Sequence, residues 1–271
     1  MKILTAYFSG TGNTCYCAEY LESRLREAGA EVSVCAVEGL PKEEIKEFDA
    51  LVVGFPVYAC DMPEIVRDFL DGIPLTAGGR AYLFCTKALS SGNALKKAEQ
   101  ILQSAGYRVS GHADVTMPGS DGLVFLKKDS AAAKKLTGGD FSVIGPLDRL
   151  AEKIVSDQKD PAGAADEVPE KPLRTKMTGL LADGLFKVAY GPVERRMAGK
   201  FYADGNCVRC GLCARVCPSR NIILTKNGVF FSNRCFLCMR CINQCPKEAI
   251  QIGRGTIGKM RWKGPDNSFN P

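Results

Sequence analysis

The sequence has little histidine and tryptophan and contains no long hydrophobic run. Its only histidine, His112, falls in a predicted strand, which favours a surface or hydrogen-bonded histidine over a catalytic one. No stretch approaches the roughly 18 apolar residues that a membrane span needs, and the start, MKILTAYFSG, lacks the apolar region and cleavage site of a secretory signal. We therefore expect a soluble, cytoplasmic protein without a membrane span.

Cysteine, in contrast, is abundant. Thirteen of the 271 residues are cysteines, and eight of them lie between positions 207 and 245. In a small secreted chain this number would indicate disulfides, but the eight cysteines have the spacing of metal ligands. The other five are scattered through the first half of the chain, and free thiols in such number are typical of a reducing compartment.

Charge is divided unevenly along the chain. Residues 1–155 carry 17 Lys and Arg against 20 Asp and Glu, whereas residues 156–271 carry 19 against 10. A basic half can indicate nucleic-acid binding, but no nucleic-acid recognition motif accompanies it. We therefore expect no nucleic-acid partner.

Strand and helix signals alternate over the first 156 residues. The apolar runs 3–8, 32–37, 50–57, 80–86 and 107–117 predict strands, and the amphipathic segments 14–28, 62–70, 93–104 and 146–156 predict helices. This alternation predicts an α/β fold, a doubly wound parallel sheet with helices on both faces.

The rest of the chain divides into three parts. Residues 157–200 begin with a proline-containing stretch of linker composition and continue into apolar residues that predict short bracing helices. Residues 201–253 contain the clustered cysteines, and residues 254–271 form a basic tail. We expect the tail either to cover a cluster, to dock an acidic partner or to be unstructured.

The cysteine-rich segment contains an internal repeat, C-x2-C-x2-C-x3-C-P, at 207–218 and again at 235–246. Cysteines spaced in this way can wrap the corners of an iron-sulfur cluster. Zinc ribbons also use C-x2-C pairs, but two tandem runs of this form favour clusters. A β-prone tetrapeptide follows each run, at 221–224 and 249–252.

These two runs resemble the bacterial two-cluster ferredoxins over about residues 201–253, a small α+β domain. The resemblance implies two [4Fe-4S] clusters, in which the fourth cysteine of each run ligates the cluster of the other run. The first ligand set would be Cys207, Cys210, Cys213 and Cys245. The second would be Cys235, Cys238, Cys241 and Cys217.

A turn rich in hydroxyl groups follows the first predicted strand and precedes the first predicted helix. It reads Ser9, Gly10, Thr11, Gly12, Asn13, Thr14. Hydroxyls and successive N–H groups at a helix start suit a phosphate dianion. The turn has neither the Walker A ending nor the G-x-G-x-x-G spacing, so a dinucleotide is disfavoured; a helix cap without a ligand is the alternative.

This turn is similar to the FMN-phosphate loop of flavodoxins, and the resemblance covers about residues 1–156. It implies the strand order 2-1-3-4-5 and a flavin over the carboxyl ends of the strands. Two further loops would then contact FMN, and their expected contact residues are Pro56, Val57, Tyr58, Ala59, Thr86, Lys87, Ser91 and Gly92. The loop after the fourth strand has no aromatic residue and the only tryptophan, Trp262, is distant in sequence, which would leave one flavin face open.

Taken whole, the chain resembles flavodoxin-ferredoxin fusion proteins of anaerobic bacteria and archaea. The resemblance implies the cofactors, FMN and two clusters. Our leading hypothesis is an electron carrier in which they form a relay to redox partner proteins, without a catalytic residue. One alternative is an enzyme, an FMN- and iron-sulfur-dependent oxidoreductase that reduces a small organic substrate or quinone. A second alternative is a non-catalytic subunit that holds no flavin.

Overall fold

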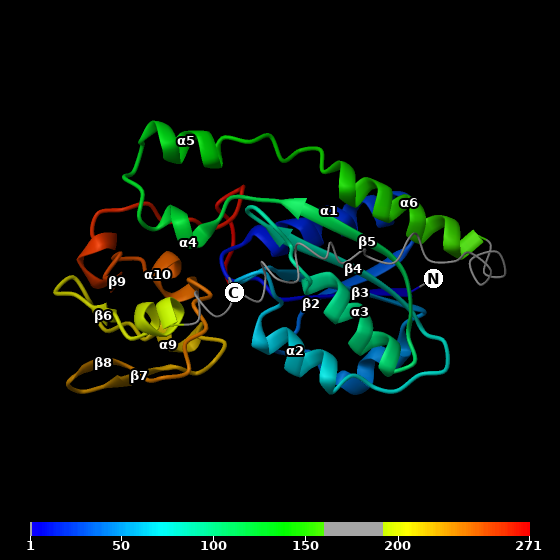
Figure 1. Ribbon diagram of the computed structural model, residues 1–271, viewed down its shortest axis with the longest axis horizontal. Helices are drawn as coiled ribbons and strands as arrows, with labels where there is room; N and C mark the ends of the chain where they lie inside the picture. Colours follow the sequence, from blue (N-terminus) through cyan, green and yellow to red (C-terminus); the bar gives the residue numbers. More distant parts are fainter. Residues whose placement is uncertain (1, 160–191) are drawn as a thin grey trace. The chain divides into compact units, whose positions relative to one another are not determined.

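The apolar runs of the first half form one parallel sheet (Figure 1). Its strands are β1 (Lys2–Tyr7), β2 (Glu31–Ala36), β3 (Ala50–Pro56), β4 (Arg80–Lys87) and β5 (Arg108–Thr116). The spatial order is β2-β1-β3-β4-β5, which confirms the predicted order. The inner strands β3 and β4 are buried along nearly their whole length, as expected of parallel strands with helices on both faces.

Helices cover both faces of this sheet. Helices α1 (Asn13–Glu27) and α6 (Gly145–Lys159) lie on one face, and α2 (Glu64–Asp71) and α3 (Ala94–Ser104) lie on the other (Figure 1). A short 3-10 helix, η1 (Lys42–Glu47), precedes β3. Hydrogen bonds to the buried Asp157 fix α6 to the sheet. The Tyr82 hydroxyl on β4 donates to Asp157 Oδ2 at 2.9 Å, and Lys153 Nζ donates to Asp157 Oδ1 at 2.7 Å.

The structure, a computed structural model, describes residues 2–159 and 192–271. Contacts divide the described residues into two compact units. The first contains residues 2–9, 14–117 and 141–159, and the second contains Gly10–Asn13, Pro118–Asp140 and residues 192–271. The predicted proline-containing linker and bracing helices fall mainly on residues 160–191, outside the described residues.

The second unit combines three stretches of sequence. The first stretch is the loop tip Gly10–Asn13. The second is the segment after β5, which contains α4 (Ser120–Leu123) and α5 (Ala131–Thr137). The sequence did not predict these two short helices. The cysteine-rich part contributes β6 (Phe201–Ala203), α9 (Leu212–Arg215), β7 (Ile222–Thr225), β8 (Gly228–Phe231), α10 (Arg240–Gln244), β9 (Ile250–Ile252) and η2 (Gly253–Thr256).

Two small antiparallel sheets frame the cysteines of this unit. The β-prone tetrapeptides form β7 and β9, and β7 pairs with β8 whereas β9 pairs with β6. A buried cluster that includes Val124, Phe201, Leu237 and Ile242 packs beneath them, and several of the cysteines lie against it. The cysteine loops are therefore fixed to an apolar core that includes one residue of the segment after β5.

Candidate functional site

The predicted flavin loops meet at the carboxyl edge of the parallel sheet. Val57 N–H donates to the Thr86 carbonyl at 2.8 Å, and the hydroxyls of Thr14 and Thr86 are hydrogen-bonded at 2.8 Å. Gly92 lies so close to the Cys60 carbonyl that a Cβ at Gly92 would stand 2.5 Å from that oxygen. The structure thus brings together the loops after β3 and β4 and the first turn of α1.

The loop after β3 has a sharp bend. Ala59 and Cys60 both have positive φ, 48° and 60°, and Tyr58 and Asp61 exchange two main-chain hydrogen bonds of 2.9 Å. The Asp61 carboxylate also accepts a hydrogen bond of 2.6 Å from Lys97 on α3. Left-handed backbone at non-glycine residues costs on the order of 1 kcal/mol or more each, so this ion pair helps to hold the bend that presents Tyr58.

Asp114 on β5 binds two of the residues that we predicted to contact the flavin. Its carboxylate pairs with Lys87 Nζ at 3.0 Å and accepts a hydrogen bond from the Ser91 hydroxyl at 2.5 Å. These contacts place both side chains against the end of β5. Asp114 was not predicted as a site residue, because one acidic residue in a strand carries no distinguishing pattern.

The tip of the hydroxyl-rich loop, Gly10–Asn13, belongs to the second unit. Among the described residues, nothing accepts a hydrogen bond from the main-chain N–H of Gly10 or Thr11, although Thr11 is buried. The Asn13 side chain is held on both sides: its amide donates to the Pro118 carbonyl and its carbonyl accepts from the Trp262 indole, each at 2.7 Å. The loop therefore combines a fixed Asn13 with main-chain N–H groups that can donate to an anion.

Four cysteines from the two repeats line one cavity. They are Cys207, Cys210 and Cys213 from the first run and Cys245 from the second. The pKa of the Cys213 thiol is raised to about 11, mainly by burial and to a smaller extent by the nearby Cys207, Cys245 and Cys210. Four thiols around one space, drawn from both runs, match the first ligand set that the resemblance implies.

The remaining four cysteines also influence one another. Burial raises the pKa of the Cys241 thiol well above its usual value, and Cys238, Cys235 and Cys217 are the next largest causes. Burial likewise raises the pKa of Cys238 to about 12, partly opposed by Arg240. A bound metal ion would compensate the negative charge of such buried thiolates and so favour their ionisation.

The backbone repeats with the sequence. Asn221 N–H donates to Cys217 Sγ and Ala249 N–H donates to Cys245 Sγ, both at 3.2 Å. The fourth cysteine of each run therefore receives a matching hydrogen bond. Positions 28 residues apart also share a left-handed backbone, and these pairs are Arg209 and Leu237, Gly211 and Met239, and Arg220 and Glu248. Five of these six residues are not glycine, and left-handed backbone of this kind persists where the surrounding structure fixes it and is common at ligand sites.

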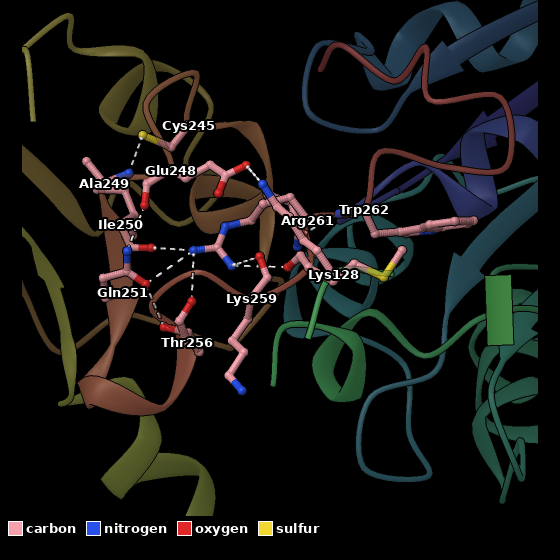
Figure 2. Close-up of polar contacts among 12 residues, drawn as sticks. Lys128, Cys245, Glu248, Ala249, Ile250, Gln251, Thr256, Lys259, Arg261 and Trp262 are labelled. Carbon is pink, nitrogen blue, oxygen red and sulfur yellow. Dashed lines mark hydrogen bonds and ion pairs between the residues drawn. The ribbon is translucent and has the colours of Figure 1, made fainter. Parts of the chain in front are cut away.

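A half-buried arginine, Arg261, lies near Cys245, the fourth cysteine of the second run (Figure 2). The Arg261 guanidinium donates to the Ile250 carbonyl at 3.4 Å, to Gln251 Oε1 at 3.2 Å and to the Thr256 carbonyl at 3.3 Å. Burial lowers the pKa of Arg261, and Glu248 and then Cys245 oppose that shift. Arg261 therefore brings positive charge into the field of a predicted cluster ligand.

Comparison with known proteins assigns both halves. The flavodoxin domain family matches residues 4–113, and the 4Fe-4S binding domain family matches residues 205–221 and 232–249. The flavodoxin of Megasphaera elsdenii is 28% identical over 131 residues, which are 47% of this chain and 96% of that protein. An uncharacterized ferredoxin of Methanocaldococcus jannaschii is 39% identical over 51 residues, which are 17% of this chain and 66% of that protein.

The chain joins a flavodoxin-like domain to a 4Fe-4S ferredoxin-type domain. Among solved structures, a flavodoxin from the domain Archaea is 21% identical with a TM-score of 0.43, and the match covers 59% of this chain and 99% of that one. Together the two domains support an electron-transfer role. None of the helices in residues 2–159 and 192–271 is long and apolar enough to cross a membrane.

The residues present fit the cofactors that these domains imply. For the flavodoxin-like domain, the fit rests on the N–H groups of Gly10 and Thr11, which have no acceptor among the described residues. For the ferredoxin-type domain, it rests on the cavity lined by four thiols. The number of clusters and the contacts of each predicted flavin residue stay predictions.

Proposed function

We propose that the chain is an electron carrier in which FMN and two [4Fe-4S] clusters exchange electrons within one molecule. FMN supplies a two-electron centre that can also act in single steps, and each cluster supplies a one-electron centre. Redox proteins that donate and accept electrons are the proposed partners. We place the chain in a reducing compartment, the cytoplasm, because its cysteine clusters require free thiols.

One observation carries this proposal: the tip of the hydroxyl-rich loop, Gly10–Asn13, and the cysteine cavity belong to the same compact unit. A continuous set of contacts joins them. Cys245 Sγ accepts from Ala249 N–H, and Arg261 donates to the carbonyl of the next residue, Ile250. Trp262, which follows Arg261, donates to Asn13 in the loop.

The chain's own residues would hold the cofactors. Gly10 and Thr11 would donate their main-chain N–H groups to the FMN phosphate, and the loops around Val57 and Gly92 would line the ring. The two crossed sets of four cysteines would each hold one cluster. Because thiolates from both runs are needed for each cluster, neither run would bind a cluster alone.

Rapid mixing with a one-electron reductant tests the proposal. In the intact chain, flavin and cluster absorbance should equilibrate by a first-order process whose rate does not depend on protein concentration. The control is an equimolar mixture of two full-length variants, T11E without flavin and C213A/C241A without clusters. Exchange in this mixture must be bimolecular, so its rate should rise in proportion to concentration.

The proposal fails if the intact chain behaves like the mixture. In that case flavin and clusters would serve separate partners. It fails in a different way if anaerobically purified protein contains no flavin, because the loop would then be a helix cap without a ligand.

A further inference from the structure

The basic tail packs closely within the second unit. Phe269 is buried, its carbonyl accepts a hydrogen bond of 2.7 Å from Gln244 Nε2, and its N–H donates to the Lys263 carbonyl at 3.1 Å. Met260 N–H donates to the Leu126 carbonyl at 2.9 Å. Together with the Arg261 contacts, these bonds fix the tail on both sides of Trp262.

Trp262 makes a first contact between the tail and the hydroxyl-rich loop. It is 7% exposed, and its main-chain N–H donates to Asn243 Oδ1 at 2.7 Å. Figure 2 shows the Arg261 guanidinium and the Trp262 indole extending in opposite directions from the tail. The single N–H of the indole ring donates to Asn13 Oδ1 at 2.7 Å.

A pair of glycines makes a second contact between the tail and the loop. A Cβ on Gly12 would lie 2.7 Å from the Gly264 Cα, and a Cβ on Gly264 would lie 3.3 Å from the Gly12 Cα. Both residues have left-handed backbone, with φ of 102° and 89°. Only glycine at both positions allows main chains in this conformation to approach so closely.

We propose that residues 262–264 are part of the phosphate site: they hold the loop tip in the conformation that receives the FMN phosphate. Trp262 is a positioning residue that acts through Asn13, and Gly264 supports the loop at Gly12. The inference rests on the proposed function, since it assigns the loop to FMN. A loop that is already fixed loses less conformational freedom when it binds an anion, so the tail should contribute to the affinity for the phosphate.

The test compares two flavins on full-length protein from which flavin has been removed and clusters retained. W262F keeps an aromatic ring but removes the hydrogen bond to Asn13, and the dissociation constant for FMN should rise about three- to tenfold. Riboflavin has the same ring system without the phosphate, so its dissociation constant should not change. The ratio of the two affinities separates an effect on the phosphate loop from a general loss of structure.

Variants of Asn13 test whether Trp262 acts through its hydrogen bond to this residue. N13A removes the acceptor of the indole hydrogen bond, so adding W262F to N13A should weaken FMN binding no further. Trp262 is the only tryptophan of the chain. Its emission in the wild-type protein should therefore change saturably as FMN is added, and inorganic phosphate should produce a change at higher concentration.

Two tail glycines, Gly264 and Gly258, provide a second test with a matched control. This test remains valid if W262F fails to fold. Gly264 and Gly258 both have left-handed backbone, but a Cβ on Gly258 would have no atom within 4 Å. Alanine strains the backbone at either position. G264A should weaken FMN binding by about threefold or more relative to G258A, because only G264A disturbs Gly12.

Three results would decide against the inference. Unchanged FMN affinity in W262F would overturn it, and so would an equal loss of FMN and riboflavin affinity or equal effects of G264A and G258A. Absence of FMN binding by the wild-type chain would instead overturn the proposed function, and the inference with it. A selective loss of FMN affinity supports both.

Discussion

Replacing Cys245 with alanine tests whether the last cysteine of the second run serves the cluster of the first. Cys245 lines the cavity that also contains Cys207, Cys210 and Cys213, so C245A removes one of four thiols from that cavity. Each iron of a [4Fe-4S] cluster needs its own ligand. We therefore expect iron to fall from about eight to about four per chain after anaerobic reconstitution, with acid-labile sulfide falling equally.

Double variants show which cysteines share a cluster from the iron content alone, without interpretation of spectra. C245A/C213A removes two ligands from one predicted cluster and should keep about four irons, whereas C245A/C238A removes one ligand from each cluster and should keep almost none. C35A, which replaces a half-buried thiol outside both runs, is the control and should keep about eight. The reverse order, with about four irons in C245A/C238A and almost none in C245A/C213A, would refute crossed ligation.

Three further variants test the hydroxyl-rich loop, the half-buried Arg261 and the core of the parallel sheet. T11E should release the flavin, because its carboxylate would repel the phosphate; flavin retained in that variant would place the phosphate elsewhere. R261Q should lower the reduction potential of one cluster by roughly 40 mV, equivalent to about 1 kcal/mol, whereas R261K and the exposed control R254Q should change it less in a redox titration. Y82F leaves the buried Asp157 with one hydrogen bond fewer, so it should reduce the free energy of unfolding in urea by about 1–2 kcal/mol; an unchanged midpoint would contradict this.

The sheet was predictable because its signals are local. Each strand is an apolar run bounded by a helix signal, and the predicted strands 3–8 and 50–57 correspond to β1 and β3 within one residue. Parallel order followed from the resemblance and from the spacing of the runs. The repeat of the cysteines was equally visible, because ligand spacing within a loop depends only on nearby residues.

The contacts of the loop tip could not be predicted in the same way. Asn13 and Trp262 are 249 residues apart, and no periodicity or spacing relates positions so distant. The segment Pro118–Asp140 was also not predicted as structured, because its helices α4 and α5 contain only four and seven residues. The single signal that could have drawn attention to the tail is a lone tryptophan among basic residues, and that pattern is equally typical of an unstructured end.

The distance in sequence between Asn13 and Trp262 sets an order of events during synthesis. The ribosome makes the loop tip well before its partner in the tail, which emerges only after 249 more residues have been added. Domains generally fold as they leave the ribosome, so the sheet can form while the loop tip still lacks Trp262 and Gly264. By the role proposed for Trp262 and Gly264, a nascent or shortened chain that ends before Trp262 would carry a folded sheet with an unsupported loop and would retain flavin less tightly.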